Sequence, residues 1–594
     1  MKNLSVISII VVIAFITSGC SGLKKMVKNA GTIQYSVTPE ILQMHADSVA
    51  IGISGKFPEK FFNKKATVVI TPVIKWEGGE KALKEVKLQG EKVEDNNTVI
   101  KVAGGNFSYN DKIPYVDDMK ISTLEVKATA AIKKKTAEFE PKKIGNGVIA
   151  TPRLLLTDAR AIIAKDNFQR ITPEIKEADI HFAVQQANIR PGEMSQEDIK
   201  GLKNYLVEVL KAENKELKGV SVSAYASPDG AEDLNAKLSE NRGVIAEKFV
   251  GTEFKNVKTP KFTDADKAIV KEKEAKFKEK AAKAQDKSVY STKSTAEDWD
   301  GFQKLMKSSD LQDKDLIVRV LEMYSDPVRR ETEIKNIASV YPKVADKILP
   351  QLRRSMLKIN VDVVGLSDEE IITLAKATPD SLTVEELLYA ATLTNDNNVK
   401  LDVYKACETV YPQEWRGFNN AGCQLVKLNK IPEAKEAFAK AKELKDGEPI
   451  VMNNFGVVAF YENDYVKSEE YLNSAAGAGA EVNYNLGLLS VKKADYEGAV
   501  KYFGSDCSFN AALAILLNGD AEGASKRIDC IEDKEVAMNY YLKAVAGART
   551  ANTDLMFNNL RAAIGKSASL AGKAKTDMEF FKYFEDETFK SIVR

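Results

Sequence analysis

Glycine recurs at matched places in the last third of the chain, and its neighbours recur with it. Gly422 and Gly456 lie 34 residues apart, and Gly487 follows in the same local context. Each is followed by an apolar or aromatic residue nine positions on, a small residue twelve on and a bulky apolar residue sixteen on: Ile431, Ala434, Phe438; Tyr465, Ser468, Leu472; Tyr496, Ala499, Phe503. Small residues let paired helices pack closely, and one pair cannot bury its apolar face alone. The pattern therefore predicts stacked helix pairs.

This spacing resembles the tetratricopeptide (TPR) repeat, and the resemblance covers residues 366–594. Leu387 to Val410 fits an earlier unit, and Gly519 with Ala524 fits a shortened later one. The resemblance implies an all-α superhelix whose concave groove binds a partner protein. A capping helix is expected at the end of the array, packed by Phe580, Phe581, Phe584 and Phe589.

The N-terminus has the pattern of a targeting segment. Lys2 precedes an apolar run from Leu4 to Ile16, which is too short to span a bilayer comfortably, and small residues then precede Cys20. This resembles a bacterial lipoprotein signal, which implies removal of residues 1–19 and lipidation of Cys20. The alternative is an uncleaved anchor with a chance cysteine. Residues 20–32 are expected to form a polar tether.

The residues after Cys20 bear on which membrane face the protein occupies. Residues 21–25 read SGLKK and hold no acidic cluster. In lipoproteins of the Bacteroidota type such a cluster marks surface export. Its absence implies an outer-membrane anchor that faces the periplasm.

Residues 33–145 have β character. Runs rich in β-branched residues at 66–74, 98–102 and 121–132 alternate with Gly and Asn pairs that favour turns. Several short strands joined by turns predict an antiparallel β-sandwich.

A second domain is expected at residues 171–365, with the order β–α–β–α. A strand at 180–184 precedes a helix that begins at Ser195, and a second strand at 219–226 ends at the turn Pro228 to Gly230. A helix that carries Asn235 and Arg242 follows. We call residues 223–244 the polar corner, since this strand–loop–helix junction presents several polar side chains.

The polar corner resembles the OmpA-like, peptidoglycan-associating domain. Gly230, Asn235, Leu238, Ser239 and Arg242 match the family pattern G-H-T-D-x-x-G-x(4)-N-x-x-L-S-x-x-R-A. In that family the loop Asp and the helix Arg hold the ammonium and carboxylate of diaminopimelate in the stem peptide, which suits charge-assisted pairing.

The match is incomplete at the charged ligand. Ser227 stands in the place of the Asp, and Asp229 follows two residues later. The resemblance implies a peptidoglycan site at Ser227, Asp229, Asn235 and Arg242. The alternative is a fold of this type that binds nothing.

A long stretch interrupts this domain at about residues 252–350. Residues 262–288 are dominated by Lys, Glu and Ala, which predicts a solvated helix rather than a nucleic-acid or lipid patch, because acidic residues interleave with the basic ones. The domain is expected to close with a strand at 356–364, which resembles the final strand of the family. Fold class is therefore multidomain: an N-terminal β-sandwich, an α+β OmpA-like domain with a helical insertion, and an all-α TPR superhelix.

Composition and motifs restrict the functional classes. The formal net charge of +1 provides no global attraction for nucleic acid, and two histidines leave little supply for a His-based metal or acid–base site. The sequence contains none of the common hydrolase, P-loop or metalloprotease motifs, so neither an enzyme, a metal site nor a cofactor is expected. Four cysteines beyond Cys20 fit no zinc spacing and are expected as buried free thiols. The alternative is disulfides, which an oxidising periplasm permits, and the sequence does not choose among the three possible pairings.

These observations predict a structural scaffold: a periplasm-facing outer-membrane lipoprotein that associates with the peptidoglycan stem peptide and with partner proteins through its repeats. An outer-membrane β-barrel complex is one candidate partner. The alternative is an accessory subunit of an outer-membrane assembly or secretion complex that does not bind peptidoglycan.

Overall fold

A computed structural model describes residues 21–594 except 262–266, 312–313, 338–340 and 534. Cys20, the expected lipidation site, lies outside the described residues. The chain divides into two compact units. The first contains residues 1–165 and 394–594, and the second contains the intervening residues 166–393. Within the described ranges, no helix combines the length and the apolar character needed to cross a bilayer.

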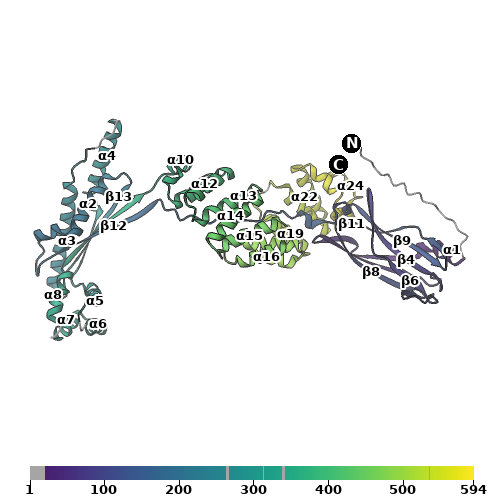
Figure 1. The fold of residues 1–594 in the computed structure, drawn as a ribbon, viewed down its shortest axis with the longest axis horizontal. Helices are drawn as coiled ribbons and strands as arrows, with labels where there is room; N and C mark the ends of the chain where they lie inside the picture. Colours follow the sequence, from purple (N-terminus) through teal and green to yellow (C-terminus); the bar gives the residue numbers. More distant parts are fainter. Residues whose placement is uncertain (1–20, 262–266, 312–313, 338–340, 534) are drawn as a thin grey trace. The chain divides into compact units, whose positions relative to one another are not determined.

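The N-terminal part of the first unit is rich in β-sheet (Figure 1). Its strands follow one hydrogen-bonded path, β1-β3-β2-β11-β9-β4-β6-β7, with β8 beside β3, β5 beside β4 and β10 beside β9. Most pairs are antiparallel; β6–β7 and β2–β11 are parallel, and the β2–β11 pair joins β1-β3-β2 to β11-β9-β4-β6-β7. The strands are β1 (Gln34–Thr38), β2 (Ile41–His45), β3 (Ser48–Phe57), β4 (Thr67–Trp76), β5 (Gly79–Ala82), β6 (Val86–Gly90), β7 (Thr98–Ile100), β8 (Gly105–Pro114), β9 (Ser122–Ile132), β10 (Lys135–Glu138) and β11 (Lys142–Ile149).

Alternating burial along β3, β8 and β9 places one face of each strand in a shared apolar core. This core includes Ile51 from β3, Val68 from β4 and Val126 from β9. We call residues 33–149 the sheet domain.

The prediction of a polar tether at residues 20–32 is wrong for the described residues. Helix α1 (Ser21–Lys28) and a short 3-10 helix (Ala30–Thr32) occupy this stretch. Leu23 and Met26 lie three positions apart, so they share one helix face, and both are buried in the core of the sheet domain. The lysines of α1 are exposed, and their number is why the sequence of this segment predicts a polar tether.

The second unit contains an α+β module. Its sheet has the order β12-β15-β13-β14, with β12 (Ile171–His181), β13 (Lys215–Tyr225), β14 (Tyr290–Thr295) and β15 (Arg354–Val364). Helices α2 (Glu197–Lys211) and α3 (Glu232–Asn256) bury apolar faces against it. The strand predicted at 180–184 is therefore the end of a longer strand that begins at Ile171. Helix α2 begins after Gln196, and Ser195 belongs to a preceding 3-10 turn.

The stretch expected as one insertion at about 252–350 has two parts. Helix α4 (Lys267–Lys283) leads to β14, which pairs in parallel with β13 and completes the sheet. Residues after β14 form α5 (Trp299–Ser308), α6 (Lys314–Met323), α7 (Pro327–Asn336), α8 (Tyr341–Lys347) and α9 (Leu349–Leu352), which share a core of their own. β14 is mostly exposed and polar, so its sequence lacks the alternation that identifies a strand.

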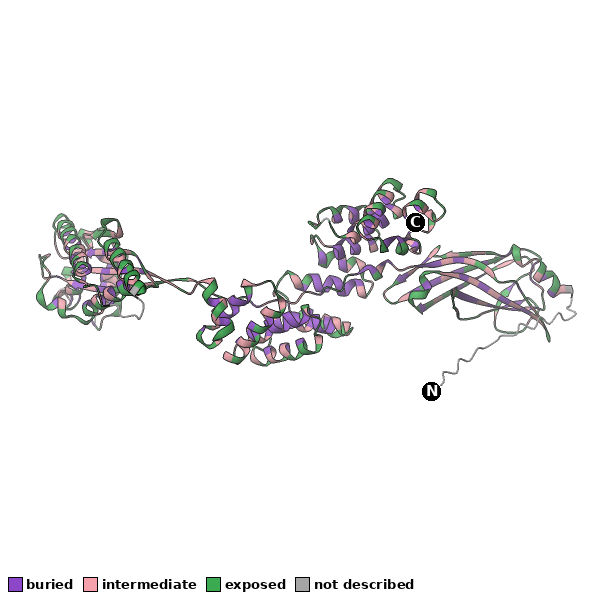
Figure 2. Ribbon diagram, turned by 90° about the horizontal axis from the view of Figure 1, so that it is seen from above, coloured by how far each residue is buried: buried purple, intermediate pink, exposed green. Residues whose placement is uncertain are grey.

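The C-terminal part of the chain is all helical, as the sequence predicts. Helices α10 (Asp368–Ala377) and α11 (Val384–Ala390) end the second unit. The array then runs through α12 (Asn397–Val410), α13 (Trp415–Lys427), α14 (Ile431–Leu444), α15 (Pro449–Tyr461), α16 (Tyr465–Ser474), α17 (Ala480–Lys492), α18 (Tyr496–Phe503), α19 (Phe509–Leu517), α20 (Ala521–Asp529), α21 (Ala537–Arg549) and α22 (Thr553–Lys566). Burial concentrates where successive pairs stack (Figure 2).

The repeating glycines have the packing role that their spacing predicts. A Cβ atom on Gly422 would lie 2.5 Å from the Phe438 ring, one on Gly456 would lie 2.7 Å from Leu472, and one on Gly487 would lie 2.8 Å from Phe503. In each pair the glycine therefore makes room for the bulky residue sixteen positions later.

The end of the array confirms one prediction and corrects another. Phe580 and Phe589 are buried, and the Phe589 ring contacts the rings of Phe580 and Phe584 in the cap formed by a 3-10 helix (Met578–Tyr583), α23 (Ser569–Ala574) and α24 (Glu587–Ile592). The prediction of free thiols is wrong for Cys507 and Cys530, which form a disulfide across the shortened pair α19–α20. Cys407 and Cys423 are buried and do not take part in this disulfide.

Candidate functional sites: the repeat groove and the polar corner

Asparagines line the inner helices of the array two positions before each repeat glycine. Asn420, Asn454 and Asn485 stand in the sequence pattern Asn-x-Gly on α13, α15 and α17, and Asn510 takes the equivalent place on α19. All four amides are buried, with exposed fractions of 2% or less. A buried amide requires hydrogen-bond partners, so this row implies a polar occupant of the groove.

The occupant is the chain's own connection between the sheet domain and the second unit. Residues 155–165, which we call the strap, have no regular secondary structure and run across the row of asparagines. The side-chain oxygens of Asn510, Asn485, Asn454 and Asn420 accept hydrogen bonds from the backbone N–H groups of Leu156, Arg160, Ile162 and Ala164 at 2.7–2.9 Å. Their amide nitrogens donate to backbone carbonyls of the strap at 2.9 Å. Later residues of the strap pair with earlier helices of the array, so the strap and the array run in opposite directions.

Each asparagine side chain thus makes the two hydrogen bonds that the backbone of a neighbouring β-strand would make. It satisfies one donor and one acceptor of an extended backbone, and every non-proline residue carries these groups. Asn419 and Asn453 add donors to Ile162 O and Arg160 O. The groove therefore recognises an extended backbone largely without regard to its side chains.

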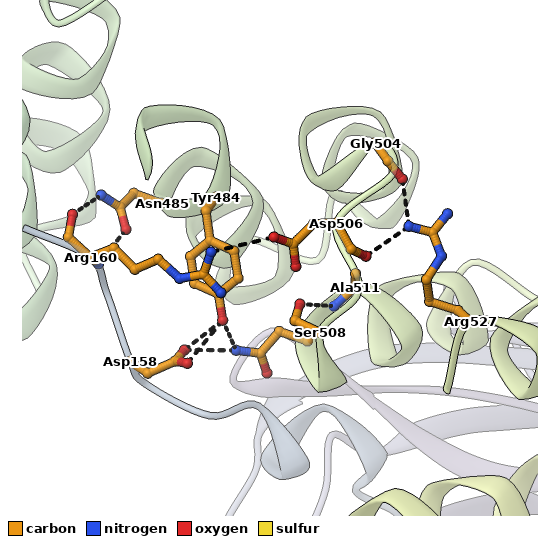
Figure 3. Close-up of polar contacts among 10 residues, drawn as sticks. Asp158, Arg160, Tyr484, Asn485, Gly504, Asp506, Ser508, Ala511 and Arg527 are labelled. Atoms are coloured by element: carbon orange, nitrogen blue, oxygen red, sulfur yellow. Dashed lines mark hydrogen bonds and ion pairs between the residues drawn. The ribbon is translucent and has the colours of Figure 1, made fainter. Parts of the chain in front are cut away.

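Two charged strap side chains fix the register (Figure 3). The Asp158 carboxylate accepts hydrogen bonds from Tyr484 Oη at 2.8 Å and from Asn510 Nδ2 at 2.9 Å. The Arg160 guanidinium stacks on the Tyr484 ring at 3.3 Å and reaches Asp506 at 3.3 Å. Burial raises the pKa of Asp158, and the hydrogen bond from Tyr484 opposes that rise.

The strap does not fill the groove completely. A cavity of about 660 Å³ lies beside it, lined by Thr157, Ala161, Lys427, Asn429, Tyr461 and Glu481 among others. Cys423 lies beneath the strap, where its thiol donates to Ile162 O at 3.2 Å. Complete burial raises the pKa of this thiol to about 12, so it is a packed hydrogen-bonding group rather than a reactive thiolate.

The sequence prediction placed a partner protein in this groove, whereas the structure places the strap there. The recurring Asn-x-Gly was the signal that the prediction missed. The strap itself has no hydrophobic period, and its partners lie 256 to 354 residues away in the chain.

The polar corner brings Ser227, Asp229 and Asn235 into hydrogen-bonding contact, whereas Arg242 donates to backbone carbonyls of other residues. Ser227 donates a hydrogen bond to Asp229, and Asn235 Nδ2 closes the loop by donating to the carbonyls of Ser227 and Gly230 at 3.2 Å. The loop thereby satisfies its own polar groups.

Arginine side chains occupy both sides of this loop. Arg242 is 1% exposed and donates to the carbonyls of Ala183, Tyr225 and Gln186 at 2.9–3.3 Å. Burial and the nearby charge of Arg353 lower its pKa to about 10. Arg353, which the sequence prediction did not include, pairs with Asp229 at 2.9 Å and donates to Ser227 Oγ at 3.2 Å.

These contacts define what the corner can do chemically. Asp229 already has a cationic partner, so an incoming ammonium must compete with Arg353 for it. A cavity of about 530 Å³ opens beside Arg353 and carries the carboxylates of Asp179, Glu193 and Asp198. Within the described residues, no group of three or more His, Cys, Asp and Glu has a metal-binding arrangement.

Comparison with known proteins identifies no family. No family model matches the chain, and no curated protein matches it. The chain is similar to the solved structure of YrrB, described as a TPR protein with an unusual peptide-binding site, at 19% identity and a TM-score of 0.25, over 29% of this chain and 97% of that one. It is also similar to yeast Tom70 (12% identity, TM-score 0.27, 67% of this chain and 88% of that one) and to the APC/C hetero-tetramer Cut9-Hcn1 (11%, 0.26, 61% and 67%). The TPR-like assignment of the array therefore rests on its own helix pairs and glycine contacts.

Proposed function

We propose that this protein is a non-enzymatic interaction scaffold, anchored by acyl chains on Cys20 to the periplasmic face of the outer membrane. The observation that carries the proposal is the asparagine row, which binds an extended polypeptide backbone by paired hydrogen bonds. A surface of this kind suits the assembly of protein segments rather than the turnover of a small substrate.

The partner binds beside the strap in this proposal. The cavity next to Thr157 and Tyr461 has a partly polar wall, where Tyr461 Oη donates a hydrogen bond to Thr157 O at 3.1 Å. A partner segment that enters this cavity would extend the strap on its outer side. An outer-membrane β-barrel complex is the candidate partner, which makes the protein an accessory subunit of an assembly or secretion machine.

Affinity purification from detergent-solubilised membranes tests the scaffold. The proposal expects an outer-membrane protein to co-purify in fixed ratio with wild type and to be lost from a Lys427→Glu/Tyr461→Ala variant, whose substitutions lie on the cavity wall. Asn473→Ala on α16 serves as the matched control, since that side chain is exposed elsewhere on the array. Equal recovery from all three proteins would exclude the cavity as the binding surface.

Peptidoglycan association is the second candidate function, and the hydrogen-bonded group of Ser227, Asp229 and Asn235, with Arg242 near enough to interact electrostatically with Asp229, favours it. In this version the ammonium of a stem peptide exchanges with Arg353 on Asp229, beside a cavity lined by three carboxylates and by Arg190 and Arg353.

Co-sedimentation with isolated peptidoglycan distinguishes the two versions. Wall binding predicts a lower bound fraction for Asp229→Ala than for the control Asp233→Ala, an exposed carboxylate in the first turn of α3. If wild type stays in the supernatant with both variants, the protein is a scaffold without a wall-binding module. Assays for hydrolysis of wall fragments check the non-enzymatic assignment.

A further inference from the structure

Helix α1 lies at one end of the sheet domain (Figure 1). Its sequence, SGLKKMVK, contains three lysines. Leu23 and Met26 anchor it in the core, each 1% exposed, while Lys24 and Lys25 are exposed. The helix begins at Ser21, and Lys24 and Lys25 follow the expected lipid anchor Cys20 by four and five residues in the chain.

Two turns of the sheet domain meet the start of α1 and add lysines to it. A Cβ atom on Gly22 would clash with the Asn63 side chain and would lie 3.6 Å from Ile132. Asn63 precedes Lys64 and Lys65 in the turn before β4, and Ile132 precedes Lys133 and Lys134 in the turn between β9 and β10. The side chains come together because β4 and β9 pair with Thr67 opposite Ala131.

We call the resulting cluster the lysine surface. It comprises eight exposed residues from four segments of the sheet domain: Lys24, Lys25, Lys60, Lys64, Lys65, Lys92, Lys133 and Lys134. Carboxylates also occur near it: Glu94 and Asp95 follow Lys92 in the chain, and Glu59 and Glu91 lie next to Lys60 and Lys92. Glu59 pairs with Lys60 at 3.4 Å, and Glu91 accepts a hydrogen bond from the Val102 N–H. The cationic charge exceeds the anionic charge around this end of the domain, although the whole chain is nearly neutral.

The surface is also hollowed. A cavity of about 460 Å³ is lined by Lys25, Lys60, Lys64, Lys65 and Lys92, with the edges of Phe61 and Phe62 at its base. Five ammonium groups around one hollow repel one another, and an anion placed among them relieves that repulsion. A compact phosphodiester suits both the charge and the small apolar base.

We propose that the lysine surface binds the anionic headgroups of the phospholipid leaflet that holds the acyl chains of Cys20. The inferred orientation of the sheet domain rests on the proposed lipid anchor, whereas the inferred binding of anionic headgroups rests on the lysine surface alone. Basic residues at the surface of an anionic leaflet each add about 1 kcal/mol of attraction, and this adds to whatever the acyl anchor provides. The sheet domain is then held with its α1 end on the membrane, instead of pivoting freely about the anchor.

Vesicle co-sedimentation tests this with the unlipidated mature chain, residues 20–594 carrying Cys20→Ser. The expected result is binding to vesicles of equal parts phosphatidylglycerol and phosphatidylcholine, no binding to pure phosphatidylcholine, and loss of binding as salt is raised. A Lys64→Glu/Lys65→Glu/Lys134→Glu variant should bind the anionic vesicles about 100-fold more weakly, since three surface lysines are lost.

The control variant is Lys75→Glu/Lys112→Glu/Lys120→Glu, which changes the same charge at the opposite end of the strands. Lys75 is exposed near the end of β4 that pairs with Ser122, and Lys112 is exposed near the end of β8 that pairs with Ser48. Both lie at the opposite end of these strands from the lysine surface, roughly 30 Å away by the length of the strands. This variant should bind as wild type does, and both variants should show wild-type circular dichroism.

Two outcomes overturn the inference. Equal weakening by both triple variants would mean that binding follows net charge alone. Complete competition by inorganic phosphate at constant ionic strength would assign the cavity to a free phosphate ion. The lipid anchor is tested separately, by the mass of the N-terminal peptide recovered from cell membranes. Loss of the anchor and failure of the lysine surface therefore give different results.

Discussion

Replacing Asn454 by Ala should release the strap from the centre of the groove. In the native protein Asn454 Oδ1 accepts from Ile162 N at 2.7 Å, and its Nδ2 donates to Ile162 O at 2.9 Å and to Asn419 Oδ1 at 2.8 Å. The substitution leaves the Ile162 N–H without this acceptor in a buried site, which costs about 1–3 kcal/mol. Ile162 O keeps the hydrogen bonds that it accepts from Asn419 and Cys423, so its loss of the bond from Asn454 adds little to this free-energy cost.

The lost bond between the two asparagines adds about 1 kcal/mol, so the strap's opening free energy should fall by about 2–4 kcal/mol. The lower figure corresponds to roughly 30-fold faster exchange of the protected strap amides. Hydrogen exchange followed by mass spectrometry, on a peptide that spans residues 155–165, measures this directly. Asn473→Ala, an exposed asparagine on an outer helix, is the matched control and should leave strap exchange unchanged.

An unchanged exchange rate in Asn454→Ala would refute the reasoning, because the strap would then be held by its side chains rather than by its backbone. Arg160 on Tyr484 and Asp158 on Asn510 would be the contacts responsible in that case.

Three further predictions concern stability. Gly547→Ala should lower the free energy of unfolding by about 1–3 kcal/mol, since its Cβ would lie 2.6 Å from the backbone nitrogen of Met556. Gly565→Ala should raise the free energy of unfolding by about 0.5–1 kcal/mol, because no atom lies within 4 Å of its added Cβ. Urea unfolding of both variants measures the two changes. Cys507→Ser should cost about 3 kcal/mol, because the Cys507–Cys530 disulfide closes a loop with a sequence separation of 23, and equal urea midpoints with and without reductant for wild type would contradict this. Burial raises the pKa of Asp577 above its ordinary 3.8, so the folded state binds the Asp577 proton more tightly than the unfolded chain does. The resulting stabilisation is present at low pH and is lost as pH rises through the raised pKa. Asp577→Asn should therefore remove this pH dependence from the free energy of unfolding measured between about pH 4 and 8.

Features with a short-range or periodic signature were predictable from the sequence. The spacing from Gly456 to Leu472 is set by the geometry of one helix pair, so it identifies the contact without knowledge of the rest of the fold. The final strand of the α+β module was predictable for a similar reason, since residues 356–364 alternate in burial along β15.

Features that depend on distant partners were not predictable in the same way. Arg353 joins the polar corner because β15 pairs with β13, which brings residues 124 to 126 positions apart into contact. The strap has no period at all, and its identity as a groove occupant depends on asparagines in the other half of the chain. Helix α1 was missed because two buried residues in eight give too small an apolar face to outweigh three lysines.

The position of the strap constrains the order in which this protein can fold. Residues 155–165 are synthesised before every helix that binds them, and the asparagines that pair with Ala164 and Leu156 follow 256 and 354 residues later. Contacts of such long sequence separation form slowly, because the intervening chain must first be closed into a loop. The repeats must therefore assemble around a segment that already belongs to another part of the molecule. Helices expressed without the N-terminal 165 residues would carry a row of unpaired buried amides, so the isolated array should be less stable than its repeat count suggests, and more prone to take up a foreign extended chain.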